Sequence, residues 1–153
     1  MSIFIEGRTC CGICREPIGS HLELVAFSPF VANQNDPISV FNDGCFHKAC
    51  FQSHPLSDQA SEQSRVCLEV AKPRNRLCYL CGDSIDDPDN YIACGYLTGN
   101  TNDPLSRYNF AQFHRSCLLE SPTRSFLAEQ LIERLASGRW KGAGLVWLAN
   151  ALQ

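Results

Sequence analysis

The chain has 153 residues, a formal net charge of −3 and ten cysteines. The acidic balance disfavours a general affinity for nucleic acid, and no run of about eighteen apolar residues is present to form a membrane helix. The first residues lack the basic region and long apolar run of a signal peptide, so the cysteines are expected to stay reduced, in the cytoplasm.

A Cys-x-x-Cys motif, Cys11 and Cys14, is followed by a His-x-x-Cys motif, His47 and Cys50. Both motifs return with every position displaced by 67 residues, and no gap is needed between Cys11 and Pro55. The second set consists of Cys78, Cys81, His114 and Cys117. Three thiolates and one imidazole form the closed tetrahedral ligand set of a structural zinc site. The shared offset therefore predicts an internal duplication and two Zn²⁺ ions per chain.

The first unit is expected to begin with a tight turn at 11–14, which directs both sulfurs at one metal. Two segments rich in β-branched and aromatic residues follow, at 22–27 and 38–41, and are predicted to pair as a β-hairpin. Asn, Asp and Pro residues at 33–37 predict a turn between them.

A short helix is predicted to start near His47, because His47 and Cys50 then lie on one helical face. This helix should stop before Pro55. A second helix, capped by Ser57, is expected to continue to about Val70. These two helices are expected to complete the first unit.

The second unit repeats this order, with predicted strands at 91–94 and 105–108 around a turn at 100–104. Apolar residues then recur at helical spacing over 126–135, and Gly138 is expected to end that helix. The repeated Asn-x-Asn-Asp-Pro turns are explained by local hydrogen bonding of Asn and Asp side chains. A pair of equivalent recognition loops is the alternative.

Four segments are expected: the first zinc-binding unit at 1–71, a polar and basic linker at 72–77, the second unit at 78–138 and an apolar tail at 139–153. The tail has no counterpart in the first unit, so a single unit does not require it in order to fold.

Glycines in the tail argue against a helix before Leu145, and both a helix and a strand are open after it. The tail is expected to pack on the two units. Trp140 and Trp147 are at the same time the candidate anchors for a partner, because an exposed tryptophan is unfavourable unless a partner covers it.

The turn, hairpin and ligand-bearing helix resemble a treble-clef zinc finger, and Phe46 and Phe113 precede each ligand histidine. Halves of LIM and RING modules are similar, but those modules need a second, interleaved quartet. The remaining cysteines are Cys10, Cys45, Cys67 and Cys94. They do not supply such a quartet at matching offsets, so the resemblance is to single-site treble clefs and covers most of residues 11–137.

The resemblance implies an α+β fold of two tandem, duplicated treble-clef-like units, each followed by a helix. It implies a metal but no single function, because treble clefs occur in nucleic-acid binders, ubiquitin-system modules and nucleases. A non-enzymatic module that binds a protein partner, as an adaptor or as an immunity-type neutraliser, is the preferred interpretation. It agrees with the acidic charge, the closed metal sites and the apolar tail.

A nucleic-acid-binding regulator is the first alternative. A basic face would be supplied by Lys48, Lys72, Arg74, Arg76, Arg107 and Arg115, and Phe41 or Tyr108 would stack a base. The aspartate-rich run at 83–89 weighs against it.

A treble-clef enzyme, such as a nuclease or a ubiquitin-system enzyme, is the second alternative. Both quartets are full, whereas a catalytic zinc keeps one position open. The two histidines outside the quartets, His21 and His54, have no duplicate. No catalytic residue is therefore expected.

Overall fold

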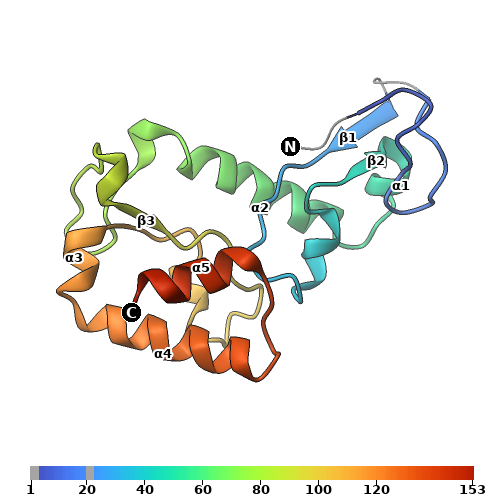
Figure 1. The fold of residues 1–153 in the computed structure, drawn as a ribbon. Coiled ribbons are helices and arrows are strands. Elements are labelled where there is room, and N and C mark those ends of the chain that lie inside the picture. Colours follow the sequence, from blue (N-terminus) through green and yellow to red (C-terminus); the bar gives the residue numbers. More distant parts are fainter. Residues whose placement is uncertain (1–3, 20–22) are drawn as a thin grey trace.

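The computed structural model describes residues 4–19 and 23–153. It has a mixed α+β fold with two similar units, as the sequence predicts (Figure 1). Helix α2 (Ser57–Val70) runs from the first unit towards the second. None of the helices in these ranges has both the length and the apolar composition that a membrane-spanning segment needs.

In the first unit, β1 (Leu24–Ala26) pairs antiparallel with β2 (Cys45–His47). Helix α1 (Lys48–Gln52) follows at once, with His47 as its N-cap residue, and it stops before Pro55 as predicted. Both the end of a strand and the start of a helix therefore fix the backbone of His47. Helix α2 begins at Ser57, which is its first residue and not its cap.

In the second unit, β3 (Tyr91–Ala93) pairs antiparallel with β4 (Gln112–His114), and α3 (Arg115–Leu119) follows. These three elements lie 67 residues beyond β1, β2 and α1. Helix α4 (Pro122–Ala136) is capped by the side chain of Ser121 and ends before Gly138, as the sequence predicts.

The predicted second strands of the hairpins, at 38–41 and 105–108, are wrong. These segments form the 3₁₀ helices Pro37–Phe41 and Ser106–Tyr108, and the strands that pair are β2 and β4. Residue 22 of the predicted strand at 22–27 lies outside the described residues.

The side chain of Asp36 explains why residues 37–41 form a 3₁₀ helix and not a strand. Its carboxylate accepts a hydrogen bond from the backbone N–H of Ile38, and Pro37 fixes the first helical position. Ile38 and Phe41, three residues apart, then point into the core on one face of the helical turn. A short apolar run bounded by Pro fits a strand and a helical turn equally well.

The core of the first unit is a cluster of aromatic rings. Phe41 meets Phe46 edge-on at a centroid distance of 5.3 Å, and Phe27 and Phe51 pack beside them. A Cβ on Gly12 would lie 2.6 Å from the Phe46 ring. The first metal-ligand turn therefore sits directly on this core, in a space that only glycine leaves open.

The core of the second unit is mostly aliphatic and includes the tail. Helix α5 (Ala143–Ala151) packs on α4 and buries Leu145, Leu148 and Leu152. The helix begins before Leu145, so the expectation that the glycines exclude it there is wrong. Gly142 precedes the helix with a φ of 153°, where an added Cβ would lie 2.3 Å from the carbonyl oxygen of Ala32.

The two units meet through main-chain and side-chain hydrogen bonds. The N–H of Ala32 donates to the carbonyl of Tyr96 at 2.9 Å, beside a β-bridge between Val31 and Tyr96. At the far end of α2, the Gln112 amide nitrogen donates to the carbonyl of Val70 at 2.6 Å. The units are therefore held together at two places, at Ala32 and at Val70, the last residue of α2.

The tail tryptophans lie in different environments. The exposed fraction is 7 % for Trp140 and 55 % for Trp147. Trp140 packs in the second core, and the Arg134 guanidinium lies over its ring at 5.3 Å.

We expect Trp140→Ala to lower the free energy of unfolding by roughly 3–5 kcal/mol, because it removes a buried aromatic side chain. Trp147→Ala should change it by no more than about 0.5 kcal/mol, as surface substitutions do. Thermal and denaturant unfolding of the two variants measures the difference, and equal losses of stability would contradict it.

Candidate metal centres

The eight predicted ligand residues form two groups in the structure. The members of the first group are Cys11, Cys14, His47 and Cys50, and those of the second group are Cys78, Cys81, His114 and Cys117. Within each group all four ligand atoms lie within 4.8 Å of one another. Each group can hold one metal ion, so the chain has two candidate centres.

Local structure places each ligand. Two sulfurs come from a tight turn, the imidazole from the junction of β2 and α1, and the last sulfur from the first turn of α1. In the tight turn at 11–14 the N–H of Arg15 donates to the carbonyl of Cys11 at 2.9 Å. In the second centre the N–H of Gly82 donates to the carbonyl of Cys78 at 2.8 Å.

The histidine rings are oriented for metal binding. His47 Nε2 lies 3.2 Å from the carbonyl oxygen of Pro17, and its Nδ1 lies 3.3 Å from Cys14 Sγ. A carbonyl oxygen can only accept, so Nε2 carries the proton and the lone pair of Nδ1 faces the sulfurs. An outer hydrogen bond of this kind is what fixes a metal-ligating histidine.

The second centre repeats this arrangement. His114 Nε2 lies 3.1 Å from the carbonyl oxygen of Ser84, and Nδ1 lies 3.4 Å from Cys81 Sγ. Pro17 and Ser84 also differ by 67 residues. Neither carbonyl is predictable from the sequence, because a backbone carbonyl leaves no signal in the residue type.

One sulfur in each centre is prepared as a thiolate. Burial opposes ionisation of Cys11, but backbone N–H groups of Cys14, His47 and Ile13 outweigh it and lower the pKa of this thiol to about 6. In the same way, burial opposes ionisation of Cys78, and backbone N–H groups lower its pKa to about 6. Thiolate is the form that binds a metal.

The neighbouring sulfurs resist ionisation when no cation is near. A hydrogen bond with Cys14, followed by burial, raises the pKa of Cys50 to about 11. For Cys81, a backbone N–H of Asp83 favours the thiolate, but burial and hydrogen bonds with Cys78 and Cys117 raise the pKa to about 11. Several thiolates cannot coexist in so small a space without a positive charge, so the donor set fits a divalent metal ion.

The other cysteines and histidines lie outside these centres. All ten cysteines are free, and burial raises the pKa of the Cys94 thiol to about 12, so it behaves as an apolar core residue. His54 Nδ1 accepts a hydrogen bond from the N–H of Leu56 at 3.2 Å. His21 lies outside the described residues.

Several of the residues considered for nucleic-acid contacts have partners within the molecule. The Glu69 carboxylate pairs with Lys72, and its Oε1 lies 3.7 Å from Arg74 Nη2. The Arg76 guanidinium lies over the Tyr91 ring. Phe41 and Tyr108 are both buried, so neither ring offers a face to a base.

Comparison of the chain with protein-family models, with curated proteins and with solved structures finds no match. The two centres are therefore assigned from the donor set, the ring orientation and their repetition at a fixed offset.

Cys14→Ser should remove the metal and the order of the first unit, and Cys81→Ser those of the second. A hydroxyl is a poor substitute for a thiolate, and binding of a structural metal supplies on the order of 10 kcal/mol of folding free energy in small zinc domains. Metal analysis and amide NMR spectra test this. Each variant should retain one metal, and retention of both metals with a native spectrum would contradict the assignment.

Proposed function

We propose that each centre holds one structural Zn²⁺ ion. Three sulfurs and one imidazole nitrogen are the donors that zinc prefers in tetrahedral structural sites. All four positions are protein ligands, so none is left for a water molecule or a substrate. When bound, the metal supplies a cross-link between the ligand turn and the strand–helix junction.

Elemental analysis of protein purified without chelators should return two zinc ions per chain. Cys10→Ser is the matched control, because Cys10 adjoins a ligand but lies outside the quartet. This control should retain both ions. Another metal in place of zinc, or a single zinc per chain, would overturn the proposal.

We further propose that the chain is a non-catalytic module that binds a protein partner. The observation that carries this proposal is the exposed apolar face of α5. Val146 and Trp147 are 48 % and 55 % exposed there, although the opposite face of the helix is buried. Tryptophan is enriched among the residues that dominate binding energy at protein interfaces.

The charge of the chain supports a basic partner. The formal charge is −3 with the thiols neutral. Six thiolates and two Zn²⁺ ions together add a net charge of −2, so the metal-loaded chain is still more acidic. Asp83, Asp86, Asp87 and Asp89 are all exposed beside the second centre. Such a surface favours fast association with a basic protein, as expected for an adaptor or a neutraliser.

Capture of partners on immobilised, zinc-loaded protein tests this function. A protein should be retained in stoichiometric amount, and Trp147→Ala should reduce its affinity by roughly 2 kcal/mol or more, as the loss of a hot-spot residue does. Val40→Ala is a matched control, since Val40 is also about half exposed but lies on the other unit. Salt-sensitive binding to random-sequence DNA, without any retained protein, would favour the nucleic-acid alternative instead.

A further inference from the structure

The duplicated units carry two loops with the same internal hydrogen bonds. We define the first loop as residues 33–36 and the second loop as residues 100–103. In the first, the N–H of Asn35 donates to Asn33 Oδ1 at 3.1 Å. In the second, the N–H of Asn102 donates to Asn100 Oδ1 at 3.0 Å. The two loops therefore present their asparagines in the same local arrangement.

One further asparagine in each unit holds the segment that precedes the loop. Asn42 Oδ1 accepts from the N–H groups of Phe30 and Val31, and its amide nitrogen donates to the carbonyl of Val31 at 2.8 Å. Asn109 makes the same three bonds to Leu97 and Thr98. The segment that leads into each loop is therefore fixed by hydrogen bonds within its own unit.

The first loop binds a stretch of main chain, the turn 138–141 that follows α4. The amide nitrogen of Asn35 donates to the carbonyls of Gly138 and Arg139, both at 3.0 Å. Asn33 Oδ1 accepts from the N–H of Lys141 at 3.1 Å. The N–H of Gln34 donates to the carbonyl of Lys141 at 2.7 Å. No side chain of the turn takes part in these bonds, so the first loop recognises backbone.

The second loop offers the same groups to solvent. Asn100, Thr101 and Asn102 are exposed. Across residues 4–19 and 23–153, no acceptor is found for the amide nitrogen of Asn102 or for the N–H of Thr101. Thr101 replaces Gln34 of the first loop, but the first loop uses only the backbone N–H at this position.

A hollow lies beside the second loop. Its position in the second unit is equivalent to the position in the first unit where the tail lies. The second-unit residues that line it include Thr98, Gly99, Thr101 and Asn109. Their counterparts in the first unit are Val31, Ala32, Gln34 and Asn42, which line a hollow together with Gly142 and Gly144 of the tail. The hollow at the second loop has a volume of about 300 Å³ and is lined by Gln59 and Gln63 of α2 in place of the tail.

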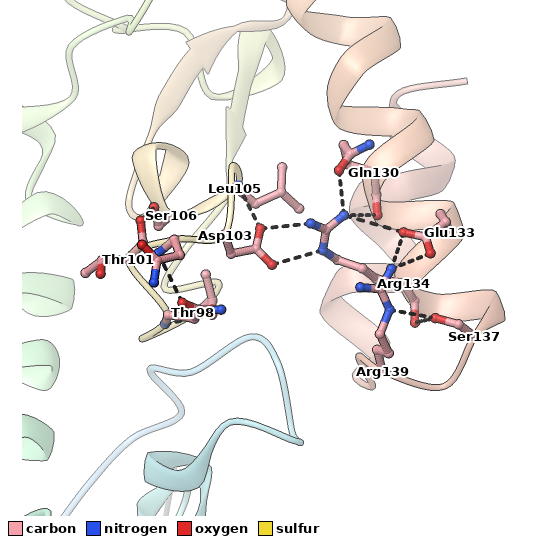
Figure 2. A network of polar contacts seen from close by, with 12 residues as sticks. Thr98, Thr101, Asp103, Leu105, Ser106, Gln130, Glu133, Arg134, Ser137 and Arg139 are labelled. Atoms are coloured by element: carbon pink, nitrogen blue, oxygen red, sulfur yellow. Dashed lines mark hydrogen bonds and ion pairs between the residues drawn. The ribbon is translucent and has the colours of Figure 1, made fainter.

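The charge of the second loop is already compensated. Asp103 points towards Arg134 of α4 (Figure 2), with Oδ1–Nη2 and Oδ2–Nε distances of 2.9 and 3.2 Å. In the first loop, the corresponding Asp36 Oδ2 accepts from the N–H of Gly99 at 2.9 Å. The recognition groups of the second loop are therefore not needed to satisfy its aspartate.

We propose that the second loop is a binding site for a main-chain turn of a partner polypeptide, held as the first loop holds 138–141. Two successive carbonyls of the partner accept from the Asn102 amide, and one N–H donates to Asn100 Oδ1. A second copy of this chain does not supply this turn, because its own first loop occupies 138–141. The inference rests on the proposed protein-binding function.

The probe is a blocked peptide with the sequence of residues 134–144, titrated into the ¹⁵N-labelled, zinc-loaded full chain. Saturable shifts are expected at amides 99–106. Asn102→Ala should weaken the peptide about tenfold, through loss of the carbonyl contacts, and should leave the melting temperature unchanged. A peptide with proline in place of Lys141 should not bind, because it lacks the N–H that Asn100 accepts.

Asn35→Ala is the matched control, the same substitution in the first loop. It should lower the melting temperature and leave the peptide affinity unchanged. Absence of shifts at 99–106, shifts at the first loop alone, or equal affinity in Asn102→Ala would each overturn the inference. Trp147-dependent capture of a partner would still uphold the proposed function in that event, so the two failures are distinguishable.

Discussion

Each unit depends on four ligands that tie a tight turn to a strand–helix junction. The regular structure around each centre is small, with strands of three residues and a helix of five residues, and it cannot provide much stability by burial alone. Gly12 lets the ligand turn lie on the Phe46 ring, and Phe46 adjoins His47 in β2. A metal ion bound at the candidate centre would therefore act on the same few residues as the core packing.

The metal centres were the most predictable part of the molecule. Their spacing was visible because a ligand must have a particular side chain, and a duplication preserves its offset. The strands at 38–41 and 105–108 were predicted wrongly because a short apolar run between Pro and Asn has no decisive period. The true partners, β2 and β4, each place one ligand histidine after two buried residues, and a strand of three residues is too short to display a period.

Other features had no signal in a single sequence. The carbonyls of Pro17 and Ser84 orient the histidines through the backbone, so any residue could provide them. Burial of Trp140 and exposure of Trp147 depend on how α5 packs on α4. Asn42 and Asn109 were in contrast detectable, because they share the 67-residue offset and their chemistry requires an amide side chain.

The bond between Lys141 and Asn33 joins residues 108 positions apart. During synthesis from the N-terminus, the ligands of the first centre are complete once residue 50 has emerged, whereas the turn 138–141 that the first loop binds emerges later. A nascent chain therefore exposes both loops in the same unpartnered state. The emergence of residues 138–141 is the event that makes them different, since only then can this turn reach the first loop.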